Sequence, residues 1–181
     1  MPQAPPKRRY PCRPGSQIPT GIRLRSSIVA RRLSGFKNLA RAIENATGST
    51  GKVPDHQRRV GRQILKKACG ALLAEVHQIK ACTSFDALFH LVERLTADIH
   101  RFGELAVYDT SLRLGAWLNK LPKKVYLHAG TRKGAKALGL DVSRGHVEMN
   151  ELPKTIKVLK PWQAEDFLCI YKDAFASRNS R

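Results

Sequence analysis

The sequence predicts an all-α protein, a helical bundle preceded by a basic arm. In several segments of the 181-residue chain, apolar residues recur three and four positions apart, which is the period of an amphipathic helix. No alternating apolar and polar pattern runs far enough to build a sheet. Residues 1–20 contain six prolines and show no helical period. We therefore expect a disordered basic arm over residues 1–25 and a single helical domain over residues 26–181.

Local signals at their ends delimit the expected helices. The first follows Ser26 or Ser27 as its cap and runs to residue 43; the second is a long helix capped by Asp55 that ends near residue 79. Ser84 caps a third helix over residues 85–99. Later helices are expected from residue 104, over 131–139 with Thr131 as cap and Gly139 as stop, and from Pro161 onward. Residues 123–130 fit either a loop or a strand.

Charge is the strongest global feature of the chain. Lys and Arg number 33 against 14 Asp and Glu, a formal net charge of +19. Residues 1–82 hold 17 of the basic and only 3 of the acidic side chains. Such a field attracts a polyanion and releases the counterions of its phosphates, so nucleic acid is the expected partner. A merely soluble basic surface and an acidic lipid surface are the alternatives.

Several classes of protein are disfavoured. No run of about 18 apolar residues is present, so we expect no membrane span and no membrane partner. The cysteines form no C-x-x-C pair and no histidine has zinc-finger spacing, so no metal site and no cofactor are expected. Cys69, Cys82 and Cys169 fit buried thiols of a reducing compartment. We expect a cytoplasmic or nucleoid-associated protein; the Arg-rich, acid-free start leaves organelle import open.

A short turn at residues 100–103 separates two helical runs. The helix after Gly103 would begin with unpaired amides, from about Glu104, and the positive end of its dipole. Such an end binds a phosphate, and a glycine there lets the backbone approach closely.

The run I-x-x-F-G-E-L-A-x-x-x-x-x-L over residues 99–112 resembles the helix-hairpin-helix motif of DNA-binding proteins. Phe102 and Gly103 match the second half of that motif, whereas Arg101 stands in place of its first glycine. Residues 85–140 as a whole resemble the helix-hairpin-helix DNA glycosylases, with residues 123–139 similar to their catalytic loop and next helix. The resemblance implies a bundle containing a helix-hairpin-helix-like unit that binds duplex DNA.

The catalytic residues of those glycosylases are not matched. Leu105 occupies the position of their lysine nucleophile, and His128 aligns with their catalytic aspartate. Asp109 is a shifted candidate acid, although its spacing from Arg113 also fits an ion pair on a helix surface. We therefore expect a binding protein rather than an enzyme. A nucleic-acid-processing enzyme using His128 or Asp109, and an RNA-binding protein, are the alternatives.

The residues expected to contact nucleic acid come from three regions. The basic helices contribute Arg31, Arg32, Arg41, Arg58, Arg59, Arg62 and Lys66; the hairpin contributes Arg101 and Gly103; the helix at 131–139 contributes Thr131, Arg132 and Lys133. Tyr126 is the candidate for stacking on a base. Tyr108, Trp117 and Trp162 lie on helical stripes and are expected in the core.

Overall fold

The computed structural model describes residues 35–53 and 57–176 of the chain, and these residues are mostly helical. The expected arm over residues 1–25, the caps at Ser26 or Ser27 and Asp55, and Arg31 and Arg32 lie outside the described residues. The helices are α2 (Leu39–Thr47), α3 (Arg62–Ala74), α4 (Val76–Ala81), α5 (Phe85–Thr96), α6 (Glu104–Trp117), α7 (Ala129–Ala137), α8 (Lys154–Lys157) and α9 (Pro161–Ala176). The all-α prediction is thus confirmed in its main feature.

The described sheet is a single antiparallel pair of two-residue strands. β1 (Val125–Tyr126) pairs with β2 (His146–Val147), with Val125 opposite Val147 and Tyr126 opposite His146. The segment at 123–130, which the sequence leaves open between loop and strand, therefore contains a short strand. Leu127 and His128 separate β1 from α7, and β2 follows that helix.

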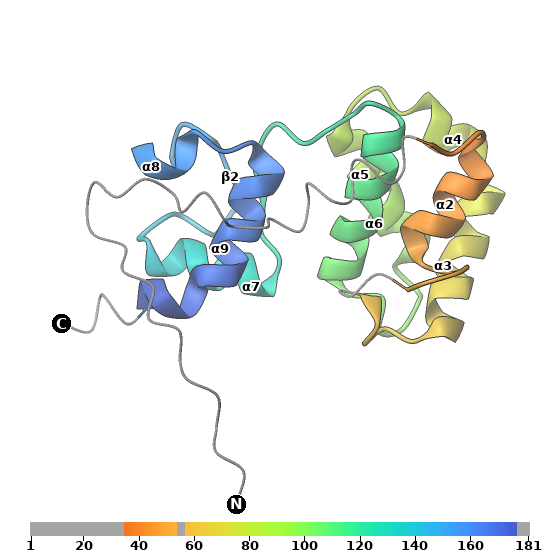
Figure 1. Ribbon diagram of the computed structural model, residues 1–181, viewed down its shortest axis with the longest axis horizontal. Coiled ribbons are helices and arrows are strands. Elements are labelled where there is room, and N and C mark those ends of the chain that lie inside the picture. Colours follow the sequence, from red (N-terminus) through yellow and green to blue (C-terminus); the bar gives the residue numbers. More distant parts are fainter. Residues whose placement is uncertain (1–34, 54–56, 177–181) are drawn as a thin grey trace, which may run out of the picture.

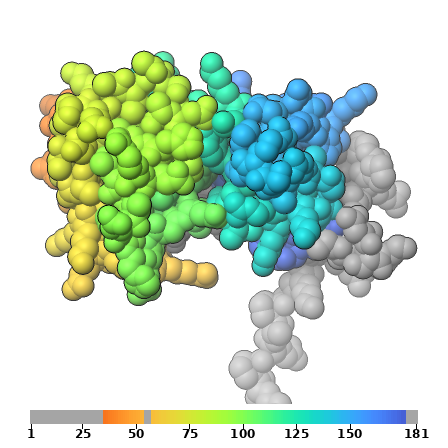
Figure 2. Space-filling model, turned by 180° about the vertical axis from the view of Figure 1, so that it is seen from behind, coloured from red at the N-terminus to blue at the C-terminus, as the bar shows by residue number. Residues whose placement is uncertain are grey.

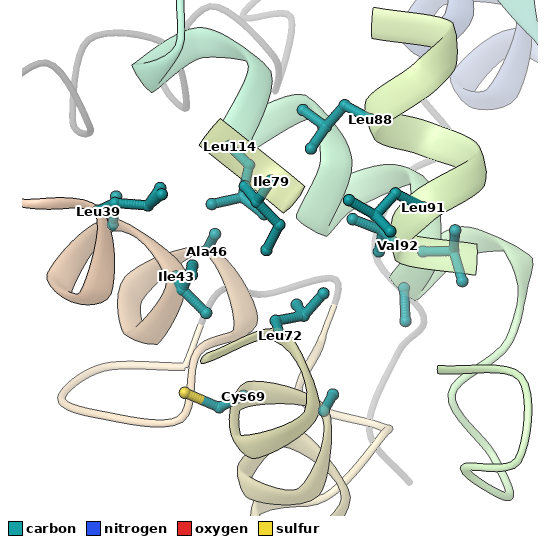
Figure 3. Close-up of a cluster of buried hydrophobic side chains, with 14 of the residues drawn as sticks. Leu39, Ile43, Ala46, Cys69, Leu72, Ile79, Leu88, Leu91, Val92 and Leu114 are labelled. Atoms are coloured by element: carbon teal, nitrogen blue, oxygen red, sulfur yellow. The ribbon is translucent and has the colours of Figure 1, made fainter. Parts of the chain in front are cut away.

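The described chain forms two packed halves, with α2–α6 in one and β1, α7, β2, α8 and α9 in the other (Figure 1). The first half packs around leucine, isoleucine, valine, alanine and cysteine side chains from five helices, as Figure 3 shows. The second half has its own core, including Val125, Leu127, Ala164 and Leu168. A third cluster joins the two halves through Phe85, Tyr108, Leu112 and Tyr126.

Helix α6 lies at the centre of this arrangement. It packs against α2 and α5, and its Tyr108 contacts Tyr126 of β1 with ring centroids 5.9 Å apart. Every residue from Ala106 to Gly115 is buried. A helix that is covered on all sides carries polar residues into the interior, where they need partners.

Some helix ends follow the local signals and others do not. Ser84 caps α5 by accepting the Ala87 N–H at 3.1 Å, and α9 begins at Pro161, as predicted. The long second helix is a wrong prediction, because α3 begins only after Gly61, whose φ of +95° is not helical, and it ends at Ala74, with Glu75 between it and α4.

The segment before α3 is held by a buried side chain. Gln57 is fully buried and donates hydrogen bonds to Ala46 O at 3.2 Å and to Thr110 Oγ1 at 3.1 Å. These contacts reach α2 and α6, so they depend on the tertiary fold. They hold residues 57–60 as a separate turn, and α3 begins only at Arg62.

Candidate functional site

The turn between α5 and α6 presents a helix N-terminus at the surface. Phe102 is buried and its N–H donates to Ile99 O at 3.0 Å, which closes the turn. Gly103 is the N-cap of α6, and its carbonyl accepts the N–H groups of Ala106 at 2.8 Å and Val107 at 3.1 Å. The amides of Glu104 and Leu105 belong to the unpaired first turn of α6, and both residues are exposed.

The turn places its left-handed residue at Arg101 rather than at Gly103. Arg101 has a φ of +69°, whereas Gly103 is extended, with φ −82° and ψ −177°. A Cβ on Gly103 would meet nothing within 4 Å. The fold therefore does not require glycine at 103, and the open space there is available to a ligand.

The hairpin turn and the basic start of α3 lie together. The guanidinium Nη2 of Arg101 donates to the carbonyl of Arg59 at 3.2 Å, across 42 positions of sequence. The side chains of this region are exposed, and the first turn of α3 contains no acid. We call this region the basic hairpin surface; it consists of Arg58, Arg59, Arg62, Lys66, Arg101 and Gly103. In Figure 2 its yellow and green segments belong to one half of the molecule, beside the cyan and blue half.

Helix α7 reaches the hairpin through an ion pair. Arg132 binds Glu104, the first residue of α6, at 3.2 Å and also donates to Leu127 O at 2.7 Å. The carboxylate that would repel a phosphate at this helix end therefore already has a cationic partner. Lys133 is exposed on the same helix.

Other predicted contact residues have different positions. Arg41 is exposed on α2 and paired with Glu44 at 2.9 Å. Thr131 is fully buried and is not the cap of α7, since His128 holds that position, so Thr131 does not face an outside phosphate. Tyr126 is also buried, with its hydroxyl bonded to Asp86, and is not placed to stack on a base.

The expected surface ion pair of α6 is buried. Asp109 and Arg113 lie 3.5 Å apart with both side chains covered, and Arg113 also donates to Ala46 O at 2.9 Å. The pair stands beside the Gln57 contacts and helps to join α2 to α6. Asp109 and Arg113 therefore form a buried ion pair that links helices, and the prediction of an ion pair on the helix surface is wrong.

His128 takes part in a buried polar cluster between α7 and α9. Its Nε2 atom contacts the Glu165 carboxylate, and Thr131 Oγ1 lies 2.8 Å from both groups. All three side chains are buried. A hydroxyl–histidine–carboxylate relay needs its two partners on opposite ring nitrogens, whereas here both lie at Nε2. The geometry is therefore not that of an activated nucleophile.

The surroundings of this cluster are acidic. Burial raises the pKa of the Glu165 carboxyl, and the contact with His128 opposes that rise. The ring of Tyr108 lies 6.1 Å from that of His128. Burial raises the pKa of Tyr108 well above its usual range, and three carboxylates add to the shift: Glu165, Asp166 and Asp109.

The sequence predicts His128 as a candidate site residue but does not predict its neighbours on α9, Glu165 and Cys169. Glu165 and Cys169 are four positions apart, a spacing that places both on one face of a helix. This spacing is the available signal, but nothing local connects it to a histidine 37 positions earlier.

None of the described helices has the length and apolar character needed to cross a membrane. The chain matches no protein-family model, no curated protein and no solved structure in the comparisons made.

Proposed function

We propose that this chain binds nucleic acid, specifically duplex DNA, through backbone phosphates and with little sequence specificity. The observation that carries the proposal is the contact of Arg101 with Arg59 O. It joins the turn before α6 to the arginine-rich segment that leads into α3. The overall charge of +19 supports the same conclusion.

Two kinds of phosphate contact are available on this surface. The first amides of α6 and the positive end of its dipole suit one phosphate group bound at close range. The arginine and lysine side chains around them suit neighbouring phosphates and release counterions when they bind. Both kinds of contact position the protein on the backbone without reading bases. The helix-hairpin-helix resemblance of the sequence agrees with this proposal.

The test is a salt-dependent binding titration with charge-matched variants. One variant changes basic residues of the basic hairpin surface to glutamine: Arg59, Arg62 and Lys66. The control removes the same charge from the far half of the molecule, at exposed positions around α8: Lys154, Lys157 and Lys160.

We expect the first variant to bind a short labelled duplex more weakly at every salt concentration. Its slope of log affinity against log salt should flatten by about 0.9 for each phosphate that the variant no longer neutralises. The control should retain most of the affinity and the slope. Equal reductions in both variants would mean that net charge alone, rather than this surface, attracts the DNA. Preferential binding of double-stranded RNA or single-stranded DNA in parallel titrations would reassign the substrate.

A further inference from the structure

Three potential metal ligands converge between α7 and α9. Nε2 of His128, a carboxylate oxygen of Glu165 and Sγ of Cys169 all lie within 4.8 Å of one another. The first two side chains are buried and Cys169 is half-buried. We infer that these three residues form a binding site for a divalent transition-metal ion, with zinc as its best-fitting occupant.

Two oxygen atoms approach the same ring nitrogen of His128. A carboxylate and a hydroxyl both crowd the same ring nitrogen, which has one proton or one lone pair to offer. A cation bound at this cluster would take the lone pair of Nε2 and an oxygen of the carboxylate as two of its ligands. Thr131 Oγ1, 2.8 Å from Glu165, would then orient the carboxylate from the side, as outer-shell hydroxyls do.

The close approach of the thiol depends on a glycine. A Cβ on Gly130 would lie only 2.6 Å from Sγ of Cys169, so a larger residue would displace the sulfur. Gly134, one turn later, allows α7 to approach the backbone of α9 at Leu168. Gly130 and Gly134 thus bring two helices, and with them the three ligands, together.

The charge balance of this region also favours a cation. The buried acid Asp109 is paired with Arg113, whereas the buried carboxylate of Glu165 contacts a histidine, which is cationic only when protonated. Buried charge is costly unless it is compensated. A divalent ion bound to Glu165 would supply compensating charge for this carboxylate.

The mixture of donor atoms indicates the class of metal. Imidazole nitrogen, thiolate sulfur and carboxylate oxygen together suit zinc, which binds each at about 2.0–2.3 Å in tetrahedral geometry. Magnesium and calcium prefer sites made wholly of oxygen atoms. Three protein ligands leave a fourth position for water or another small ligand.

The test uses the full-length chain without an affinity tag, stripped with a chelator and dialysed. Zinc titrated against a competing chelator should bind at one ion per chain, and its binding should release the Cys169 thiol proton, measured with a pH indicator. Cobalt(II) in place of zinc should give the charge-transfer absorption of a thiolate ligand. The proton and cobalt measurements need no variant, so they test the site even if substitutions unfold the protein.

Variants then locate the ion. Cys169→Ser and Glu165→Gln should each weaken zinc binding by at least about tenfold, and Cys169→Ser should abolish the cobalt–thiolate band. Cys69→Ser is the matched control, since Cys69 is a buried thiol in the other half of the molecule. Equal binding by the two cysteine variants, or no stoichiometric zinc on the wild-type chain, would overturn the proposal. The cluster would then be a hydrogen-bonded tie between α7 and α9 only.

Discussion

Gly103 offers a test of phosphate binding in which loss of function cannot arise from loss of structure. The residue is extended and a side chain there would meet nothing within 4 Å, so substitutions are sterically accepted. Asparagine and aspartate are both good N-caps, and each would accept an amide N–H of the first turn of α6. We therefore expect Gly103→Asn and Gly103→Asp to equal or exceed the wild type in stability, by a few tenths of a kcal/mol.

Their effect on binding should have the opposite sign. The capping side chain takes an amide that the phosphate would use, and a hydrogen bond to a charged group contributes about 1.5–3 kcal/mol. This corresponds to a tenfold to roughly hundredfold loss of duplex affinity for Gly103→Asn. Gly103→Asp should bind more weakly still, because its carboxylate also repels the phosphate. The difference between the two variants should shrink at high salt.

Thermal melting and fluorescence anisotropy with a short duplex, on the same samples, measure both quantities. Variants that melt at or above the wild-type temperature and still bind with wild-type affinity would refute the reasoning. The turn would then be a structural joint, and the basic side chains alone would account for any attraction to nucleic acid. A gain in stability with a loss of affinity has no explanation in the folded fraction.

Three further predictions concern packing and charge. Gly134→Ala should lower the free energy of unfolding by roughly 1–3 kcal/mol, because its Cβ would lie within 2.9 Å of the Leu168 carbonyl group. Gly70→Ala, on an open side of α3, should raise the free energy of unfolding by roughly 0.5–1 kcal/mol. Urea titrations measure both variants, and equal changes in the free energy of unfolding would contradict the close packing at Gly134. Glu104→Gln breaks an exposed ion pair and should reduce stability by at most about 1 kcal/mol. It should also tighten duplex binding in an anisotropy titration, and unchanged or weaker binding would contradict a phosphate site next to this carboxylate. Gln57→Leu removes two buried hydrogen bonds and should reduce stability by roughly 1–2 kcal/mol in thermal denaturation; a neutral result would show that this anchor is dispensable.

The features predicted correctly are those that short-range chemistry controls. The side chain of Ser84 caps α5 across three positions, and Pro161 begins α9 because its missing N–H is not needed there. The start of α6 after Gly103 follows from the break in helical period around the turn. Each of these signals lies within one helical turn of the boundary that it predicts.

The boundary of α3 depends on residues far away in sequence. The apolar stripe predicts a continuous helix, and nothing local shows that Gln57 binds Ala46 O and Thr110. Once those contacts hold the segment, Gly61 takes a positive φ and the helix begins at Arg62. Tertiary contacts here override a helical pattern.

The burial of polar residues likewise cannot be predicted from the local sequence. An acid and an arginine four positions apart look the same on a covered helix as on an exposed one, so their spacing alone favours a surface position for Asp109 and Arg113. The structure covers α6 on all sides from Ala106 to Gly115, and the pair becomes internal. The burial of Glu165 is not predicted either, because its partner His128 lies 37 positions earlier, at the N-cap of another helix.

Arg101 connects the conformation of the hairpin to its proposed function. A left-handed conformation costs a residue other than glycine about 1–2 kcal/mol, and the exposed hydrogen bond to Arg59 O returns a similar amount, about 0.5–1.5 kcal/mol. The arginine therefore brings little or no net stability, and a positive charge two residues before the N-cap of α6 offers a functional reason for it. Arg101→Gly relieves the strain and Arg101→Ala does not, so the glycine variant should be the more stable by about 1 kcal/mol. Both should lose the same affinity for a duplex, roughly 1 kcal/mol or less, because each lacks the same guanidinium. If affinity instead follows the melting temperatures of the two variants, the arginine serves the fold and not the phosphate backbone.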